Sequence, residues 1–254
     1  MAKYETIIYE VKEPIATVTL NRPERRNALN AQLCTEMANA LLEAEADESV
    51  RVVVLTGTPP VFCGGQDLRM DSEERQIYGP ARQRAEQTIR RLKKVVIARI
   101  NGDAMGGGTY MATACDIVVA VSTARFALRE IQAGFISAGA QFYTIGMRRA
   151  LEMSLTGRYV FADEAERWGL INKAVPADEL NQAVNEYVEM IANLQPLGLM
   201  YTKLINCFIL DNLANMEAVR PINQVISGIL RQSEDQAEAR SAVLEKRKPV
   251  FKGR

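Results

Sequence analysis

The chain of 254 residues contains no histidine. A Ser-His-Asp or Cys-His nucleophile system is therefore excluded, because each needs an imidazole to take the proton of the nucleophile. Proton transfer would fall to Glu, Asp, Tyr, Lys or Cys. The four cysteines form no CxxC pair. With no histidine beside them, they give no metal-site spacing, so we expect no metal.

An excess of one charge, a long apolar run and a secretion signal are also missing. Lys+Arg and Asp+Glu both number 31, whereas a nucleic-acid partner usually requires a basic excess. No stretch reaches the roughly 18 apolar residues of a transmembrane helix, and the first residues carry no basic-then-apolar signal. We therefore predict no nucleic-acid partner and no membrane partner, in a reducing, cytoplasmic setting.

Strand and helix patterns alternate along the first half of the chain. Short apolar segments predict strands at 6–11, 15–20, 51–57, 95–100 and 116–121. Apolar residues at helical spacing predict helices at 31–46, 72–94 and 106–114. From residue 140 onward the patterns are helical, with breaks near Gly157, Pro176 and Pro196. This order predicts an α/β core with parallel strands at 1–195 and a helical region at 196–254 that covers the core or forms a subunit interface.

Two glycine-containing loops follow the predicted strands at 51–57 and 95–100. The first contains VFCGGQDL at 61–68, and the second contains NGDAMGGGTY at 101–110. Glycines let the backbone approach a ligand closely, and the second loop opens a helix, whose first N–H groups are unpaired. Two such loops can direct two N–H groups at one oxygen, which is an oxyanion hole. For either loop alone, an ordinary tight turn is the alternative. A nucleotide site is not indicated, because neither GxGxxG nor a Walker lysine is present.

Eight segments, in order, resemble the crotonase superfamily, the enoyl-CoA hydratase/isomerase family, over nearly the full chain. They are NRPERRNALN at 21–30, RVVVLTG at 51–57, FCGGQDL at 62–68, INGDAMGGG at 100–108, ACDIVVA at 114–120, ARFALREIQAG at 124–134, LTGRYVFADEAERWGLINKAV at 155–175 and KPVFKGR at 248–254. One such motif would be weak, but eight in the right order are specific.

The resemblance implies a spiral of ββα units with a helical C-terminal trimerisation region, and a homotrimer or homohexamer. It implies an acyl-CoA thioester substrate, with coenzyme A as part of the substrate and no separate cofactor. The oxyanion N–H groups would belong to Gly64 and Gly107. Arg25 and Arg26 would contact phosphates, since guanidinium matches phosphate oxygens, or would be solvated loop charges. The residues expected along coenzyme A are Arg22, Arg25, Arg26, Ala28, Gly64, Gly65, Gln66, Asp67 and Leu68.

The family's hydratases typically use two glutamates, and this chain keeps one of the two positions. The first glutamate follows the GGG by two residues, where this chain has Tyr110. The second position holds Glu130, after Arg129, and the proline expected shortly beyond is Ser137. We expect Glu130 to transfer protons at the acyl chain, with a pKa raised by its apolar surroundings. Tyr110 would orient a water or a substrate oxygen, or would simply form a wall of the acyl pocket.

Several reactions fit a single catalytic carboxylate. Hydration of a 2-enoyl-CoA is the leading interpretation. Double-bond isomerisation is an alternative, as is an aromatic enoyl-CoA hydratase-lyase, whose motif of Glu, Ile, two residues and Gly resembles residues 130–134. Dehalogenase and thioester-hydrolase chemistry is disfavoured by the absence of histidine. An inactive homologue that only binds CoA esters is the alternative of another class, and loss of the first glutamate favours it.

Overall fold

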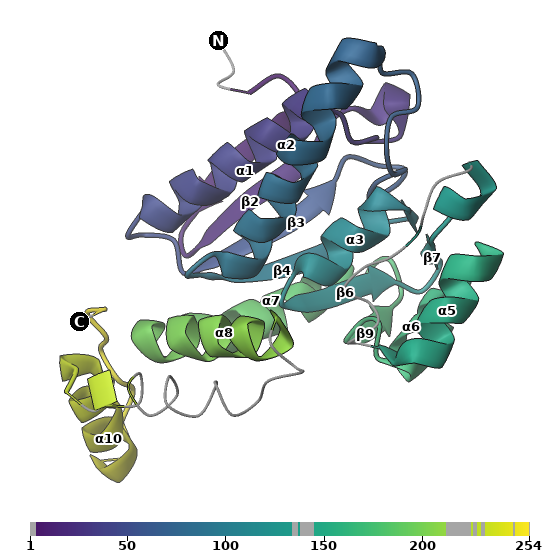
Figure 1. Cartoon of the computed structure of the whole chain (residues 1–254). Coiled ribbons are helices and arrows are strands. Elements are labelled where there is room, and N and C mark those ends of the chain that lie inside the picture. Colours follow the sequence, from purple (N-terminus) through teal and green to yellow (C-terminus); the bar gives the residue numbers. More distant parts are fainter. Residues whose placement is uncertain are drawn as a thin grey trace.

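A six-stranded sheet organises the fold. The computed structural model describes residues 4–133, 137, 145–211, 225, 228–229, 232–245 and 247–253 (Figure 1). The strand order is β1-β2-β3-β4-β6-β9, and every neighbouring pair except β1–β2 is parallel. The strands are β1 Ile7–Lys12, β2 Ile15–Leu20, β3 Val52–Gly57, β4 Val95–Ile100, β6 Ile117–Val121 and β9 Lys173–Val175.

A three-stranded sheet, in the order β5-β7-β8, forms the second layer. Its strands are β5 Ala104–Met105, β7 Arg125–Ala127 and β8 Val160–Phe161. β5 follows β4 and leads into α3 (Gly107–Ala114), and β7 follows β6 in the same way. In these two stretches the chain sends one strand to each sheet before it enters a helix, in agreement with the predicted spiral of ββα units.

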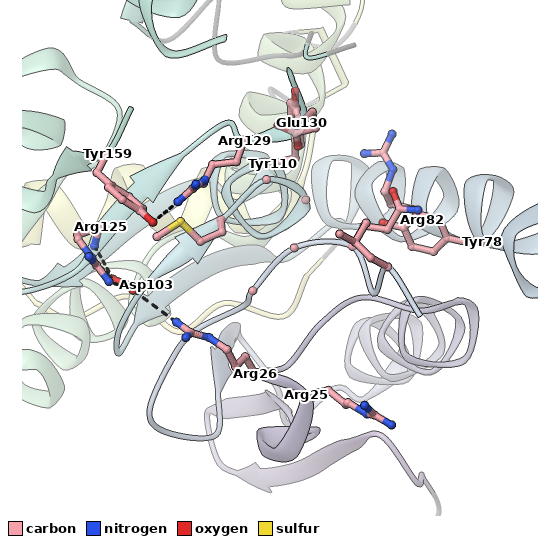
Figure 2. Close-up of a pocket in the computed structure, with 17 residues that line it drawn as sticks. Arg25, Arg26, Tyr78, Arg82, Asp103, Tyr110, Arg125, Arg129, Glu130 and Tyr159 are labelled. Atoms are coloured by element: carbon pink, nitrogen blue, oxygen red, sulfur yellow. Dashed lines mark hydrogen bonds and ion pairs between the residues drawn. The ribbon is translucent and has the colours of Figure 1, made fainter. Parts of the chain in front are cut away.

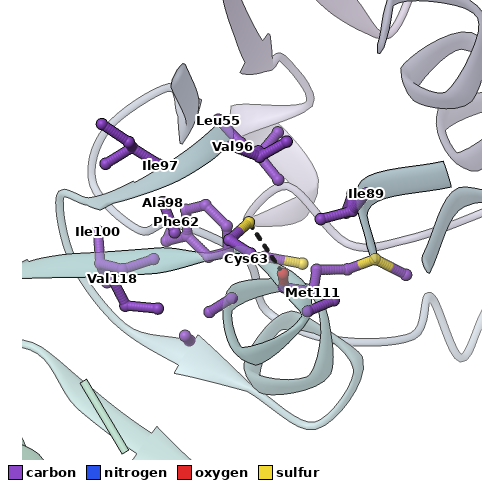
Figure 3. Packing of buried hydrophobic residues seen from close by; sticks show 14 of the residues in the cluster. Leu55, Phe62, Cys63, Ile89, Val96, Ile97, Ala98, Ile100, Met111 and Val118 are labelled. Carbon is purple, nitrogen blue, oxygen red and sulfur yellow. Dashed lines mark hydrogen bonds between the residues drawn. The ribbon is translucent and has the colours of Figure 1, made fainter. Parts of the chain in front are cut away.

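Helices α1 (Ala31–Ala46) and α2 (Ser72–Arg91) lie side by side on one face of the large sheet (Figure 1). Each begins at a capping side chain: Asn30 accepts from the Leu33 N–H over 2.9 Å, and Asp71 accepts from the Glu74 N–H over 2.8 Å. The core lies between the sheet and these helices. Figure 3 shows its centre, where Phe62 packs among the strands and α3 and is fully buried.

The patterns after residue 140 are mainly helical, and they miss two short strands. Two strands, β8 and β9, lie between α5 (Met147–Thr156), α6 (Ala162–Trp168) and α7 (Leu180–Ala192). Strands of two and three residues are too short to show a period of two in the sequence. Their place is set by their partners, since β9 completes the large sheet beside β6 and β8 pairs with β7.

The C-terminal region is helical, with α8 (Pro196–Asp211) and α10 (Glu234–Glu245). Lys203 of α8 is buried and its ammonium pairs with Asp116 over 2.7 Å, which fixes α8 against the core. α10 lies beyond α8, at the far end from the small sheet (Figure 1). The division at residue 195 stays a prediction. Within the described ranges, no helix combines the length and apolar character that crossing a membrane requires.

Candidate active site

The two glycine-containing loops pack directly against each other. The Met105 N–H donates to the Cys63 carbonyl over 2.9 Å, and the Cys63 N–H donates to the Asp103 carbonyl over 3.1 Å. A Cβ atom on Gly108 would lie 2.5 Å from the Cys63 carbonyl oxygen, so only glycine permits this approach. Because β3 and β4 are parallel neighbours, the loops after them meet at the same edge of the sheet.

Two backbone N–H groups, those of Gln66 and Gly107, are available where the loops meet. Leu29 forms a parallel bridge with Gln66: the Leu29 N–H donates to the Gly65 carbonyl, and the Asp67 N–H donates to the Leu29 carbonyl. In such a bridge the N–H of the middle residue, Gln66, points away from Leu29. Gly107 opens α3, where N–H groups have no intrahelical partner. A Cβ atom on Gly107 would lie 3.7 Å from the Gln66 nitrogen. Within the described part of the chain, neither N–H has a hydrogen-bond acceptor.

The prediction that Gly64 supplies an oxyanion donor is therefore wrong. Its N–H donates to the Arg26 carbonyl over 2.8 Å and is already satisfied. The next residue, Gly65, has φ = 94°, a left-handed conformation that favours glycine. With two adjacent glycines, the sequence does not show which of the following peptide groups faces the ligand.

The segment 22–28 is tied to the first loop by internal contacts. Asn27 is fully buried, and its side-chain amide donates to the carbonyls of Thr58 and Val61 over 2.8 and 2.9 Å. Arg22 pairs with Asp67 over 3.0 Å and also donates to the Ala28 carbonyl. Coenzyme A was expected to lie along Arg22, Ala28 and Asp67. They lie outside the cavity lining and hold the loop in place.

A cavity of about 830 Å³ opens where the loops meet (Figure 2). Of the residues expected along coenzyme A, the lining includes Arg25, Arg26, Gly64, Gly65, Gln66 and Leu68. It also includes the expected Gly107, Tyr110 and Glu130. Other lining residues, which the sequence analysis did not single out for the site, are Tyr78, Arg82, Asp103, Met105, Gly106, Arg125, Arg129 and Tyr159. Five of the lining side chains are arginines and two are carboxylates, so the cavity favours an anionic ligand.

Glu130 begins the short helix η2 (Glu130–Ala133), and its carboxylate lies against Gly106. A Cβ atom on Gly106 would lie 2.8 Å from the Glu130 Oε1, and Gly106 has φ = 47°. The Oε2 atom is buried and has no hydrogen-bond partner among the described residues. Burial raises the pKa of Glu130 above 4.5, although its own N–H, Arg82 and the Ser137 hydroxyl oppose the shift. Such a carboxylate is suited to exchange protons near neutral pH.

A hydroxyl chain connects Tyr110 to Glu130. The Tyr110 phenol lies 3.2 Å from the Ser137 Oγ, and the Ser137 side chain hydrogen-bonds to Glu130. When Glu130 is ionised it can only accept, so Ser137 donates to it and Tyr110 donates to Ser137. Tyr110 is thus part of the polar site as well as of its wall. Gly134, the last residue of the motif at 130–134, lies outside the described residues.

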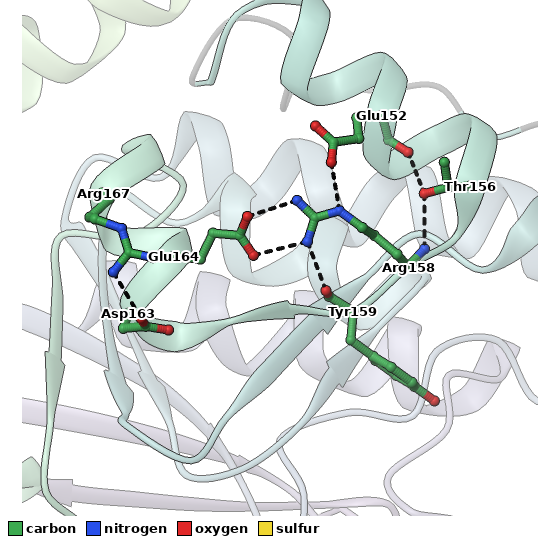
Figure 4. Close-up of polar contacts among 7 residues, drawn as sticks. All are labelled: Glu152, Thr156, Arg158, Tyr159, Asp163, Glu164 and Arg167. Atoms are coloured by element: carbon green, nitrogen blue, oxygen red, sulfur yellow. Dashed lines mark hydrogen bonds and ion pairs between the residues drawn. The ribbon is translucent and has the colours of Figure 1, made fainter.

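The opposite side of the cavity carries a stacked aromatic ring. The guanidiniums of Arg125 and Arg129 are 4.7 and 5.0 Å from the Tyr159 ring centroid, and Arg129 also donates to the Tyr159 hydroxyl. Arg125 also pairs with Asp103 over 2.6 Å. Figure 4 shows how the adjacent Arg158 joins α5 to α6 through two carboxylates, which holds the Tyr159 segment in place.

Comparison with known proteins shows the family of this chain. The family model described as Enoyl-CoA hydratase/isomerase matches residues 10–254. The chain belongs to the enoyl-CoA hydratase/isomerase family, so it is an acyl-CoA-processing enzyme of the crotonase superfamily, as the motifs indicated.

Relatives of known name are similar along the whole chain. The (E)-benzylidenesuccinyl-CoA hydratase of Thauera aromatica is 33% identical, over 97% of this chain and 99% of its own length. The 2,3-dehydroadipyl-CoA hydratase of Escherichia coli is 32% identical, over 98% and 99%. The enoyl-CoA hydratase structure from Bacillus anthracis superposes with a TM-score of 0.90 at 29% identity, covering 98% of this chain and all of that one.

Proposed function

We propose that the chain hydrates a 2-enoyl-CoA thioester, with Glu130 as the only carboxylate acid and base. One observation carries the proposal: the Glu130 carboxylate lies against Gly106, immediately before Gly107, whose N–H is available beside that of Gln66. A thioester carbonyl oxygen held by the two N–H groups would have its acyl carbons next to this carboxylate.

The proposed reaction uses one proton twice. As the water oxygen bonds to the β carbon, Glu130 takes a proton from that water, and the C=C electrons move onto the thioester as an enolate. The N–H groups of Gln66 and Gly107 stabilise the enolate oxygen. Glu130 then returns the proton to the α carbon. The net change is addition of one water, with hydrogen and hydroxyl on the same face of the double bond because one carboxylate serves both carbons.

Tyr110 and Ser137 support the choice of hydration. A water bound beside Glu130 could also hydrogen-bond to the hydroxyl groups of Tyr110 and Ser137, which are linked to the carboxylate. These contacts could orient a lone pair of the water toward the β carbon. The names of the relatives from Thauera aromatica and Escherichia coli, both hydratases, point the same way.

Double-bond migration is the second candidate, favoured by the same single carboxylate. The other acid in the cavity lining, Asp103, pairs with Arg125 over 2.6 Å and with Arg26 over 3.7 Å, so it is engaged elsewhere. Glu130 alone could take a proton from one carbon of a 3-enoyl-CoA and return it to another. A hydratase-lyase acting on an aromatic acyl group is a further possibility, for which the nearby Tyr78 ring would be a suitable neighbour.

Coenzyme A is proposed to enter as part of the substrate, with its phosphates near Arg25 and Arg26. The Arg26 side chain is 63% exposed and lies 3.7 Å from Asp103, so it can reach a solvated phosphate while it stays oriented. No separate cofactor has a role in the reaction written above.

The experiment is incubation of crotonyl-CoA, a 3-enoyl-CoA and an aromatic enoyl-CoA with the protein in deuterated water, followed by mass spectrometry and NMR. Addition of water to crotonyl-CoA with one deuterium at the α carbon is the expected result. Migration of the 3-enoyl double bond without hydration would establish the isomerase instead. Three unchanged and unlabelled thioesters, with binding shown separately, would leave an inactive CoA-ester-binding protein.

We also propose that the chain assembles as a homotrimer or homohexamer in the cytoplasm. Large apolar side chains are exposed in the C-terminal region, including Val225 at 63% and Ile229 at 48%. Such side chains favour burial in a subunit interface. Light scattering after size-exclusion chromatography would give three or six times the chain mass of 28.2 kDa, and a monomer would contradict the proposal.

A further inference from the structure

Helix α2 presents two polar side chains to the cavity, Tyr78 and Arg82. They are four residues apart and therefore lie on one face of the helix. Tyr78 is buried, and its hydroxyl would lie 3.7 Å from a Cβ atom on Gly107, so it is close to the proposed oxyanion donors. Arg82 lies one turn further along the same face and lines the same cavity.

Arg82 lies at the end of the cavity that holds the proposed proton-transfer group. Its guanidinium carbon is 5.9 Å from the Tyr110 ring centroid, and its charge acts on the Glu130 carboxyl. Figure 2 shows Arg25 and Arg26 on one side of the glycine loops and Arg82 on the other, with Tyr110 and Glu130. If the phosphates of coenzyme A bind at Arg25 and Arg26, Arg82 faces the acyl group.

Arg125, on the opposite side of the cavity, is committed to a protein partner, whereas Arg82 makes a weaker contact with the protein. Arg125 forms a two-pronged pair with Asp103 over 3.1 and 2.6 Å. Arg82 contacts Glu86 on its own helix through a single nitrogen, Nη1, over 3.1 Å. Within the described ranges, no other hydrogen bond leaves its guanidinium, which has five N–H groups arranged for two-pronged pairing.

A guanidinium in this position selects for negative charge. The Arg82 side chain is 34% exposed, so an ion pair with it is only partly screened by water. Carboxylate is the anion that an acyl chain can carry, and its two oxygens match the guanidinium fork. An uncharged acyl end would gain nothing from the guanidinium.

From these contacts we propose that Arg82 binds a second carboxylate on the acyl group. The substrates would then be CoA thioesters of dicarboxylic acids. This inference rests on the proposed function for the orientation of the thioester, with the acyl group on the Arg82 side of the glycine loops. It adds the substrate class, which the catalytic residues do not determine.

The test measures binding of unreactive, saturated thioesters, so it does not depend on turnover. Dissociation constants of adipyl-CoA and hexanoyl-CoA, which differ by the terminal carboxylate, are compared by calorimetry, and glutaryl-CoA and pentanoyl-CoA give a second chain length. The wild type should bind at least one carboxylated thioester about 10- to 100-fold more tightly than its uncharged counterpart, the range expected for a charged hydrogen-bonded pair.

Arg82→Met should bring that ratio close to one. The matched control is Arg84→Met on the same helix, because Arg84 is exposed, donates to Asn39 and does not line the cavity. The control should keep the wild-type ratio. Glu86→Gln, which removes the carboxylate that pairs with Arg82, should keep the ratio or increase it, and this variant leaves Arg82 itself intact.

Equal affinity of the wild type for the charged and uncharged members of both pairs would overturn the proposal. So would an Arg82→Met variant that weakens both members alike, because that is the result for a residue that only supports the helix. Failure of the proposed hydration has a different signature, since both crotonyl-CoA and a 2-enoyl-CoA with a terminal carboxylate would stay unchanged in deuterated water while the carboxylate preference persisted in binding.

Discussion

Substitution of Glu130 by Gln should separate activity from stability. The amide keeps the size of the side chain and removes its ability to take a proton. General acid–base catalysis contributes about 10²- to 10⁴-fold, which corresponds to about 3–5 kcal/mol of barrier at about 1.4 kcal/mol per tenfold. We therefore expect kcat for crotonyl-CoA hydration to fall by that factor, with little change in the dissociation constant of hexanoyl-CoA.

The same substitution should stabilise the fold at neutral pH. Burial raises the pKa of Glu130 in the folded state, so the folded protein prefers the protonated carboxyl. The favourable contribution of this group is complete below its unfolded pKa and is lost as the pH rises through the folded pKa. At pH 7 the ionised carboxylate opposes folding. The Tm of Glu130→Gln should therefore exceed that of the wild type at pH 7, and the difference should shrink toward pH 4.

The assays are the loss of enoyl absorbance for hydration and a thermal scan at both pH values. Full hydratase activity in Glu130→Gln would remove the carboxylate from the mechanism. A lower Tm at pH 7 would show that the contacts of the carboxylate, including the hydrogen bond from Ser137, outweigh the cost of burying its charge, contrary to the raised pKa.

Three further predictions concern other residues. Gly107→Ala should lower kcat about 10²- to 10³-fold, because the added methyl would lie beside the proposed oxyanion donors. The fold should be retained, because the nearest neighbour of the methyl, 2.8 Å away, is the end of a flexible leucine side chain. Full activity would contradict this prediction. Ser137→Ala removes a hydrogen bond that lowers the pKa of Glu130, so the acid limb of the pH–rate profile should move to higher pH; an unmoved limb would show that Ser137 does not act through this carboxyl. Lys203→Met should destabilise the protein by about 3 kcal/mol in urea unfolding, since it leaves Asp116 without its ammonium partner, while kcat stays unchanged; equal stability would refute the importance of this ion pair.

Much of the fold was predictable because long elements carry their own pattern. The helix at 31–46 matches α1 because its apolar residues follow helical spacing, and the strand at 95–100 matches β4 because it is a short apolar run between polar residues. β8 and β9 were missed because their few residues are specified by partners far along the chain. The unbroken helix predicted over 72–94 ends at Arg91, where the chain turns into β4.

The sequence predicted several residues that line the cavity, but it did not predict both backbone N–H groups of the proposed oxyanion site. Glu130, Gly107 and Tyr110 line one cavity as expected, because the motif spacing fixes them relative to the strands. Gln66 was not among the predicted donors, because two adjacent glycines leave open which of the following N–H groups faces the cavity, and the φ of 94° at Gly65 is seen only in the structure. Arg82 was missed for another reason: it is one of several arginines on a charged helix, and only the packing of α2 shows which one meets the cavity.

The most direct test of the proposed oxyanion site is the infrared carbonyl stretch of crotonyl-CoA, labelled with ¹³C at the thioester and bound to Glu130→Gln so that turnover does not interfere. Hydrogen bonds from Gln66 and Gly107 polarise the carbonyl, so we predict a stretch at lower wavenumber than that of the free thioester in water. The shift should become smaller in the double variant that also carries Gly107→Ala, because the added methyl crowds the oxygen site while both N–H groups remain. A bound carbonyl that absorbs where the free thioester does would contradict the site.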